Sequence, residues 1–474
     1  MTPLLHNQAV QAFIDGNYND TILLTNYTIR QDKNYKPAHV LRATALHKAQ
    51  DLVAAEAAMR ELFDRWGTDG RIASLVGVFF SDTGRHEEAI PFFRAACQAE
   101  LDDAACKADL AQCLSRAGHD DEAEVMFLAD SGSAVMLKTY GVFLDAKNRR
   151  MEAVEAYRKA VALHPDYEDA HFNLGLDLLL LGQYEEGFEE YEWGQALAAQ
   201  KGHLSFQFEE PIWKGEDLAG KRILLYCNQG YGDLIHMARY FPVLKSMGAE
   251  VHLCCSQSIG QLLATAGGIA YWSSSRTDEK LRADYRCCVM QLPRVLKQYP
   301  ADVPYLTAPK VREELFATDK LYKVGVCWAG GAGAPVDSRR SIPASVFTPL
   351  AGHPKVQLYS LQKEHETRWW NNQHVNLSDG WEDLGAVNLA PHMTDFLATA
   401  GLIQNLDLVV TADTAVAHVA GALGVRTWVL VPESPDWRWG IEGDGCRWYP
   451  SVRVFRRKGN WANVVAEVMG QLAG

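Results

Sequence analysis

The sequence predicts a helical-repeat α-solenoid followed by two doubly wound α/β domains of the Rossmann-like type. Three observations lead to this fold class. Small residues recur every 34 positions over the first 200 residues, short apolar strands alternate with helices after Gly202, and those strands fall into two groups. A chain of 474 residues also has room for about three domains, because single cores rarely grow past roughly 200 residues.

The repeat is visible in three registers, which share the spacing of 34 residues and one shortened interval of 30. The first register consists of small residues, at Ala9, Ala43, Gly77, Ala111, Gly141 and Gly175. The second is also small, at Ala55, Ala89, Ala123, Ala153 and Gly187, and the third is larger, at Met59, Phe93, Phe127, Tyr157 and Tyr191. Small residues let antiparallel helices approach closely, and we expect the larger ones to fill the space between neighbouring repeats. About six repeats fit within residues 1–200.

The candidate strands of the second half are short, mostly β-branched, and bounded by Gly, Pro or Asp. They are Arg222–Cys227, Glu250–Cys255, Lys323–Trp328, Val356–Leu361, Asp407–Thr411 and Thr427–Val431. A polar segment at 309–321 separates two groups, so we expect one domain at 204–315 and another at 316–474. Ligands of such sheets bind where the strands end and loops enter helices, which directs the search for a site to those loops.

The loop that follows the first strand reads NQGYGD. Gly230 and Gly232 permit a tight turn and close approach by a ligand, with Gln229 beside them. Asp233 stands at the start of the next helix and is expected to face the cleft between the two domains. Its carboxylate fits two roles, a helix cap or a general base.

The loop after the LDLVVT strand leads into a helix that begins near Thr414. The first amides of that helix, at Thr414, Ala415 and Val416, have no partner within the helix and suit a pyrophosphate. Asp413 is placed to orient a sugar hydroxyl or the acceptor. His418 shares a helix face with Ala415, where it either reaches a phosphate oxygen or is a partly buried histidine bonded to backbone.

The first 200 residues resemble the tetratricopeptide repeat (TPR) family. The clearest stretches are EAVEAYRKAVALHPD at Glu152–Asp166 and NLGLDLLLLGQYEEGFEEY at Asn173–Tyr191. The resemblance implies a superhelix whose concave groove binds an extended protein or peptide segment. The alternative is an array that only scaffolds or dimerises the rest of the chain.

Residues 204–474 resemble glycosyltransferase family 9, the heptosyltransferase-like branch with the two-domain GT-B fold, and within it the subgroup that carries TPR repeats. The stretches that carry the resemblance are QGYGDLIHMARYFPVL, VMQLP, KVGVCWAGG, RRSIPASVFTPL, YSLQKE, TDFLATAGLIQNLDLVVTADTAVAHVAGALG and PDWRWG. The resemblance implies an acceptor-side domain at 204–315, a nucleotide-sugar donor domain at 316–474, and transfer with inversion of the anomeric centre.

The resemblance gives Asp233 the role of catalytic base, which deprotonates an acceptor hydroxyl. It gives Arg340, with Arg339 beside it, the role of donor-phosphate cation, and the alternative for Arg340 is a surface salt bridge. A cation and a helix N-terminus would stabilise the leaving nucleoside diphosphate without a divalent ion. Neither sheet loop contains a DxD metal motif, so we expect no metal and no cofactor beyond the nucleotide-sugar co-substrate.

On the donor side, the resemblance places Asp413 and the amides of Thr414 and Ala415 against the donor. It places Gln362 and Lys363, at the end of YSLQKE, near the ribose or base.

Three segments depart from the family pattern or leave their role open. The loop AGGAGAPVDSRRS lacks the Asn-Pro that the subgroup often carries after WAG, and His236 replaces a common amide. The Trp- and Arg-rich segment Pro435–Phe455 suits base stacking or acceptor contact. Aromatic packing between the last strand and the C-terminal helix is the simpler interpretation of that segment.

Composition excludes several classes of partner. A formal net charge of −13 argues against nucleic acid and anionic membranes, which need a positive footprint. No signal peptide and no apolar run long enough to insert in a membrane is visible, so a cytoplasmic location is expected. The ten cysteines form no CxxC pair and are expected to be buried thiols.

The leading functional hypothesis is a protein-directed glycosyltransferase whose repeats capture the acceptor. Repeat-bearing enzymes that glycosylate flagellin in the bacterial cytoplasm resemble this layout, which makes flagellin a candidate acceptor. One alternative is a heptosyltransferase-like enzyme that acts on lipopolysaccharide or another glycan. Another is a TPR scaffold with a vestigial, non-catalytic sugar-nucleotide domain.

Overall fold

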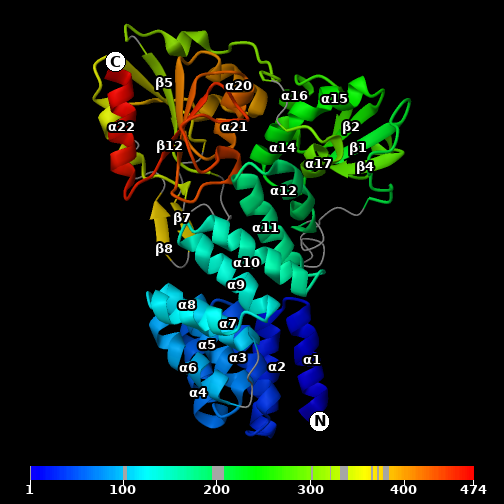
Figure 1. The fold of residues 1–474 in the computed structure, drawn as a ribbon, viewed down its shortest axis with the longest axis vertical. Helices are drawn as coiled ribbons and strands as arrows, with labels where there is room; N and C mark the ends of the chain where they lie inside the picture. Colours follow the sequence, from blue (N-terminus) through cyan, green and yellow to red (C-terminus); the bar gives the residue numbers. More distant parts are fainter. Residues whose placement is uncertain are drawn as a thin grey trace. The chain divides into compact units, whose positions relative to one another are not determined.

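The computed structural model describes residues 2–99, 104–194, 208–299, 303–320, 322–330, 340–363, 367–370, 373–376 and 384–473. The chain divides into two compact units, Met1–Ala170 and His171–Gly474, each with its own architecture (Figure 1). Within the described part of the chain, no helix combines the length and the apolar character that crossing a lipid bilayer requires.

The first unit is built from consecutive helix pairs, as the 34-residue spacing predicts. Its helices are α1 Thr2–Ile14, α2 Tyr18–Gln31, α3 Lys36–Lys48, α4 Leu52–Trp66, α5 Gly70–Asp82, α6 His86–Gln98, α7 Ala104–Ala117, α8 Asp120–Ala129, α9 Ala134–Ala146 and α10 Arg150–Leu163. Two of the turns end on glycines with a left-handed backbone, Gly16 at φ +77° and Gly84 at φ +78°. Glycine adopts this conformation at little steric cost, so these positions mark the turns as expected.

The residues of the three registers are buried, but their contacts differ from the expectation. A Cβ atom built on Gly77 of α5 would lie 2.9 Å from the ring of Phe93 in α6. A Cβ atom built on Gly141 of α9 would overlap the ring of Tyr157 in α10. The larger residue therefore packs on the small residue of its own helix pair, where the missing side chain leaves room for a ring, rather than only between neighbouring repeats.

The second unit begins with one more helix pair, α11 Glu168–Leu180 and α12 Tyr184–Tyr191. The repeat register assigns this pair to the array, because Gly175, Gly187 and Tyr191 continue the three registers. The division into units nevertheless groups residues from His171 onward with the two sheets that follow. The last repeat pair is thus part of the body that contains the sheets.

The first sheet has four parallel strands in the order β3-β2-β1-β4. Its strands are β1 Arg222–Tyr226, β2 Glu250–Cys254, β3 Ile269–Ser273 and β4 Tyr285–Cys288. The helices of this lobe are α14 Tyr231–Met237, η1 Ala238–Tyr240, α15 Phe241–Ser246, α16 Gln257–Ala264, η2 Glu279–Leu281, η3 Val289–Gln291 and α17 Leu292–Leu296. The strand order reverses between β1 and β4, and the loop after β1 therefore opens at a topological switch point, where ligands of such sheets bind.

The second sheet has six parallel strands in the order β12-β11-β10-β5-β6-β9. Its strands are β5 Tyr322–Cys327, β6 Val356–Ser360, β9 Val387–Asn388, β10 Leu408–Ala412, β11 Thr427–Val431 and β12 Val452–Arg456, and a separate antiparallel pair is β7 Thr367–Trp370 with β8 Gln373–Asn376. The helices are η4 Glu313–Phe316, η5 Ala344–Phe347, α19 Thr348–Ala351, η7 Ala390–His392, α20 Phe396–Ile403, α21 Ala415–Ala422, η8 Trp437–Trp439 and α22 Trp461–Ala473. Here the switch point lies between β5 and β10.

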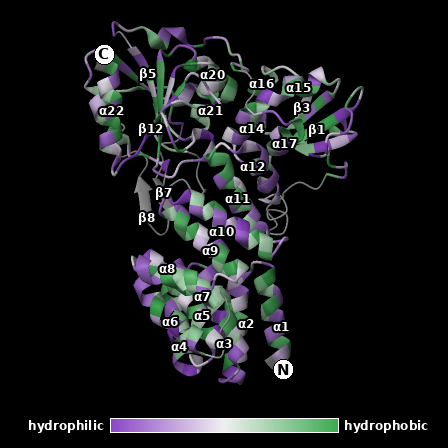
Figure 2. Cartoon of the chain, in the orientation of Figure 1, coloured by the Kyte–Doolittle hydropathy of each residue, from purple (hydrophilic) through white to green (hydrophobic). Residues whose placement is uncertain are grey.

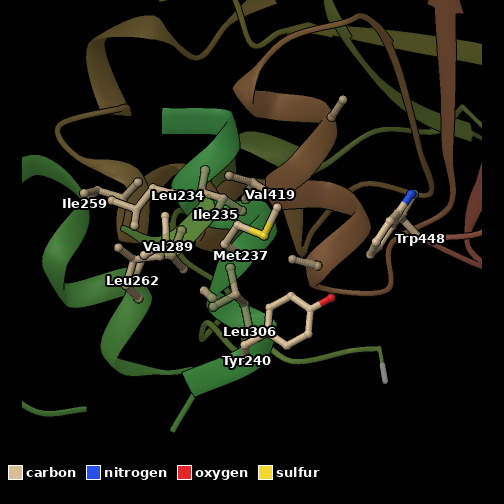
Figure 3. Close-up of a cluster of buried hydrophobic side chains, with 14 of the residues drawn as sticks. Leu234, Ile235, Met237, Tyr240, Ile259, Leu262, Val289, Leu306, Val419 and Trp448 are labelled. Carbon is tan, nitrogen blue, oxygen red and sulfur yellow. The ribbon is translucent and has the colours of Figure 1, made fainter. Parts of the chain in front are cut away.

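Alternate residues of the second sheet enter two different cores, as expected for a sheet covered on both faces. Leu408 and Val410 pack with α19 and α22, whereas Val409 packs with α20 and α21. Figure 2 shows mostly hydrophobic residues along β1 and β5. The core that holds α21 is continuous with the first lobe, and Figure 3 shows Leu234, Ile235 and Val419 directed into one cluster.

Candidate active site

The loop after β1 places the carboxylate of Asp233 in the first turn of α14. Its Oδ2 accepts a hydrogen bond from the backbone N–H of Gly230 at 3.0 Å. Asp233 is the third residue of the helix, and its side chain accepts from the backbone amide of the N-cap residue, as in a capping box. The carboxylate therefore caps the helix. The capping bond occupies one carboxylate oxygen and leaves the other for a second partner.

That partner is Arg438, which lies in η8 of the second lobe. Its Nη2 donates to Oδ1 of Asp233 at 2.5 Å, and its Nη1 donates to Oδ1 of Asp436 at 2.8 Å. The guanidinium also lies 4.1 Å from the ring centroid of Trp437. Only 5% of the Arg438 side chain is exposed, so its interactions occur largely out of water, where charge-assisted hydrogen bonds are strong.

Burial decides the protonation properties of this group of charges. Burial raises the pKa of Asp233 above its usual value, Arg438 opposes that rise, and Asp436 adds to it. Burial alone would lower the pKa of Arg438, but Asp436 and Asp233 raise it above its usual range. The arginine therefore stays charged, and Asp233 is a carboxylate that binds a proton more readily than an exposed aspartate.

The loop after β10 contributes a second buried carboxylate, Asp413. Burial, followed by the negative charge of Asp436, raises the pKa of Asp413 to about 6, while Arg340 pulls it down. Arg340 acts in the same direction on Asp233. Its positive charge is therefore shared by the two carboxylates, one from each lobe.

Two buried histidines join the lobes through one tyrosine hydroxyl. The Oη of Tyr449 lies 3.0 Å from Nδ1 of His236 and 3.0 Å from Nδ1 of His418. Burial lowers the pKa of both histidines well below the usual value, and nearby arginines add to the effect. Both imidazoles are therefore neutral, and each can exchange a hydrogen bond with the hydroxyl as donor or acceptor.

Helices α14 and α21 approach closely at Gly232. A Cβ atom at this position would lie 2.8 Å from Cδ2 of His418. The ring of His418 is also stacked on Trp439, with centroids 5.2 Å apart. Glycine is required here because the backbone of the first loop lies directly against an imidazole of the second lobe.

A cavity of about 450 Å³ opens at the switch point of the second sheet. Residues at the ends of β5, β6 and β10 form most of its wall, namely Cys327, Ala329, Gly330, Leu361, Gln362, Lys363, Thr414, Ala415 and Val416. The rest of the wall consists of Met393, Asp395, Phe396 and Thr399 of the second lobe and Tyr231 and Ser258 of the first lobe. The cavity is thus lined by both lobes.

A second cavity of about 380 Å³ lies in the first lobe, beyond the ends of β1 and β2. It is lined by thiols, hydroxyls and backbone, with Gln229, Gly230 and Arg276 among its polar residues. Tyr231 belongs to the walls of both cavities. Asp233 lies two residues further along α14 and is absent from the described walls of both cavities. The described residues include no group of three or more His, Cys, Asp or Glu side chains placed to hold a metal ion.

Comparison with known proteins found two family matches and a relative that spans most of the chain. A family described as glycosyltransferase family 9 (heptosyltransferase) matches residues 355–440, and a TPR repeat family matches residues 146–182. The chain is 24% identical to Protein FlbA of Caulobacter vibrioides over 538 residues, 97% of this chain and 88% of that protein. The chain is a tetratricopeptide-repeat protein with a heptosyltransferase-like glycosyltransferase domain.

Two further similarities concern parts of this repeat-bearing glycosyltransferase-like protein. It is 36% identical over 70 residues to Uncharacterized protein MJ0572 of Methanocaldococcus jannaschii, 15% of this chain and 81% of that protein. TTC0263, a thermophilic TPR protein in Thermus thermophilus, has a crystal structure that aligns with a TM-score of 0.31 and 16% identity, over 38% of this chain and 100% of that chain.

The residues that sequence analysis selected in this glycosyltransferase-like domain fall into three groups. Gln362, Lys363, Thr414 and Ala415 line the larger cavity, and Gln229 and Gly230 line the smaller one. Asp233, Asp413 and Arg340 form the charged group between the lobes. Gly232 and His418 form the contact between α14 and α21. Arg339 lies outside the described residues, as does most of the AGGAGAPVDSRRS loop.

Two of these side chains have structural partners that sequence analysis did not foresee. Oε1 of Gln362 accepts from the backbone N–H groups of Trp328 and Ala329, at 3.2 and 3.0 Å, so this oxygen holds the loop after β5. His418 bonds to the Tyr449 hydroxyl, not to backbone, and is absent from the described walls of the two cavities. The His418 ring is stacked on Trp439 and is only 5% exposed. It is therefore positioned to hold the lobes together.

Arg438 is the functional residue that sequence reasoning missed. The expectation that the aromatic residues of Pro435–Phe455 pack between the last strand and the C-terminal helix holds for Phe455, which shares a core with α22, and is wrong for the others. Trp437 and Trp439 belong to the core around α14 and α21, whereas α22 belongs to the other core. The available signal was the DWRW sequence, a charged pair two residues apart inside an otherwise aromatic stretch.

Proposed function

We propose that this chain is an inverting, metal-independent glycosyltransferase of the GT-B class, which moves a sugar from a nucleotide-sugar to a hydroxyl of a protein acceptor. The observation that carries the proposal is the position of Asp233. This carboxylate is 22% exposed, has a pKa raised by partial burial, and lies two residues after Tyr231, which lines both cavities. A general base works best when its pKa approaches the working pH, which burial favours here.

In the proposed step, the Asp233 carboxylate takes the proton of the acceptor hydroxyl. The acceptor oxygen forms a bond to the anomeric carbon as the bond from that carbon to the donor phosphate breaks. The bonding electron pair leaves with the nucleoside diphosphate, and attack from the opposite side inverts the anomeric centre. We assign the smaller cavity to the acceptor and the larger one to the donor, because the larger one includes the start of α21.

Negative charge that develops on the leaving diphosphate needs compensation. Arg340 supplies positive charge beside Asp233 and Asp413. The N-terminal amides of α21 supply a second source, because Thr414, Ala415 and Val416 line the larger cavity. Asp413, whose pKa is raised to about 6, is suited to bind a sugar hydroxyl as acceptor or, when protonated, as donor.

Arg438 favours the ionised form of Asp233, the proposed base. Burial and the negative charge of Asp436 both raise the pKa of Asp233, and Arg438 opposes that rise. The ion pair with Arg438 favours the ionised form of Asp233, which is the form that can accept a proton. Arg438 also orients the carboxylate, because the second oxygen is held by Gly230.

The acceptor is proposed to be a protein segment bound by the repeats, and flagellin is a candidate. The TPR match supports recognition of a polypeptide in general. A second candidate is a glycan acceptor, which the heptosyltransferase description of the matched family favours.

The test is transfer by the purified full chain with a panel of UDP-, GDP-, CMP- and ADP-sugars. Candidate flagellin and a lipopolysaccharide core are offered as separate acceptors, and products are read by intact mass. A mass gain on the protein acceptor that the Asp233→Asn variant does not give supports the proposal. Transfer only to the glycan supports the second candidate. No transfer with any pair, and no binding of any nucleotide by calorimetry, would overturn both.

A further inference from the structure

The last repeat helix, α12, is packed against both lobes of the glycosyltransferase-like domain. Its Phe188 ring is stacked on Tyr299 of the first lobe, with centroids 5.5 Å apart, and meets Trp437 of the second lobe edge-on at 5.5 Å. Tyr184 meets Trp448 edge-on at 5.2 Å. Such buried aromatic pairs hold α12 in one place relative to the loops of both lobes.

Tyr191, at the carboxyl end of α12, reaches the loop that carries Asp233. Its Oη accepts a hydrogen bond from Nε2 of Gln229 at 2.7 Å. Burial, followed by the charge of Asp233, raises the pKa of Tyr191, so the phenol stays neutral. Gln229 lines the smaller cavity and precedes the Gly230 amide that holds Asp233.

The position of Tyr191 in the repeat accounts for a large side chain there, but it does not account for the hydroxyl group. The larger residue of this register is Met59, Phe93 or Phe127 in other repeats, so the packing of a helix pair does not need a hydroxyl here. Tyr191 is 7% exposed, its backbone lies against Gly175, and its ring meets Phe172 of α11 with centroids 5.3 Å apart. The bond to Gln229 is an additional interaction, directed out of the repeat and into the candidate active site.

We propose that Tyr191 is a positioning residue of the active site, contributed by the repeat array, whose hydroxyl fixes Gln229 and thereby the turn that holds the Asp233 carboxylate. The proposal rests on the function proposed above, because it presumes that Asp233 is the base. It also means that the last repeat is part of the catalytic body and not only a connection to the acceptor-binding repeats.

The test compares Tyr191→Phe with Tyr157→Phe in the full-length protein. Both variants remove a hydroxyl at the same register position. Both introduce phenylalanine, which other repeats have at this position as Phe93 and Phe127. For Tyr191→Phe we expect kcat to fall roughly 3- to 10-fold, the loss of one buried hydrogen bond, with an unchanged KM for the nucleotide-sugar. For Tyr157→Phe we expect kcat to stay within about 2-fold of the wild type. A role in stability alone would not separate kcat from KM in this way.

A cycle with Gln229→Leu isolates the bond between the two side chains. If Tyr191 acts through Gln229, the double variant loses no more kcat than Gln229→Leu alone. Hydrogen exchange of residues 228–233 gives a readout that does not depend on transfer, and Tyr191→Phe should speed exchange there while Tyr157→Phe does not. If the wild type transfers no sugar, the proposed function fails, yet the exchange experiment still decides whether Tyr191 holds the loop. Equal kcat for wild type and Tyr191→Phe, or unchanged exchange, would overturn the proposal.

Discussion

The carboxylate of Asp233 and the guanidinium of Arg438 form an ion pair of 2.5 Å that joins the two lobes across 205 residues of sequence. Arg438 is 5% exposed and Asp233 is 22% exposed, and each partner has a further hydrogen bond that fixes its orientation. Asp233 receives the Gly230 amide, and Arg438 donates to Asp436. A residue of the opposite lobe therefore opposes the rise that burial causes in the pKa of the proposed base.

Replacing Asp233 by Asn tests whether the carboxylate is the base. Asn keeps an oxygen that can accept from Arg438, so the fold should be retained, but it cannot take a proton. We expect kcat to fall by about 10²- to 10⁴-fold, the usual contribution of general base catalysis. Initial rates of nucleoside diphosphate release measure the effect. The exposed Asp444→Asn serves as control, and a comparable loss in both variants would refute the assignment.

Replacing Arg438 by Gln tests the control of the Asp233 pKa. Burial already raises that pKa and Arg438 opposes the rise, so removal of the positive charge should raise it further. The variant then needs a higher pH to ionise its base, and the acidic limb of kcat/KM should move to higher pH. The pH profiles of the two proteins measure the shift. Coincident acidic limbs would show that Arg438 does not act on the titrating base.

Replacing Asp413 by Asn tests the burial of the second carboxylate. Its folded pKa of about 6 lies above the usual value of 3.8, so the folded state binds a proton more tightly than the unfolded state. The stabilisation from that proton is complete below the unfolded pKa and is lost as pH rises through about 6. The Asn variant lacks this loss, so relative to the wild type it should gain stability between about pH 4 and 7, on the order of 3 kcal/mol.

Urea unfolding followed by tryptophan fluorescence at several pH values measures that difference. A stability difference between wild type and Asp413→Asn that does not change with pH would mean that the carboxylate titrates normally.

Two glycines of one loop give a matched pair of stability tests. An alanine at Gly232 would place its Cβ atom 2.8 Å from His418, a contact that requires the lobes or the ring to move. An alanine at Gly230 would meet Oδ2 of Asp233 at 3.4 Å, which is ordinary contact. We expect Gly232→Ala to cost about 1–3 kcal/mol, as overpacking does, and Gly230→Ala to cost less. Thermal unfolding of both variants decides, and equal melting temperatures would contradict the close approach.

Much of the fold could be predicted because its signals are local. The 34-residue registers predict the helix pairs, and six short apolar runs predict the positions of β1, β2, β5, β6, β10 and β11 to within one or two residues. The strands β3, β4, β9 and β12 were not among the predicted strands. Arg interrupts β4 and β12, β9 consists of Val387–Asn388 alone, and the apolar run of β3 is short. Edge positions in both sheets explain that composition, since one side of such a strand has no neighbouring strand.

The site was only partly predictable, for a physical reason. Loops at strand ends could be found from the strand pattern, and these loops contain Asp233 and Asp413. The partners of these carboxylates are set by how the two lobes pack, and no spacing in the sequence encodes a pair 205 residues apart. The same holds for the contact of Tyr191 with Gln229, which depends on where α12 rests.

One phenol ring stands in the walls of both cavities. Tyr231 touches the space assigned to the donor and the space assigned to the acceptor, and it meets Phe396 of the second lobe with centroids 4.9 Å apart. We therefore expect occupation of one cavity to affect Tyr231 and, through it, the wall of the other cavity. Steady-state rates measured over a grid of both substrates should give intersecting double-reciprocal lines, because the two reactants meet across a shared partition and must be present together before either product departs.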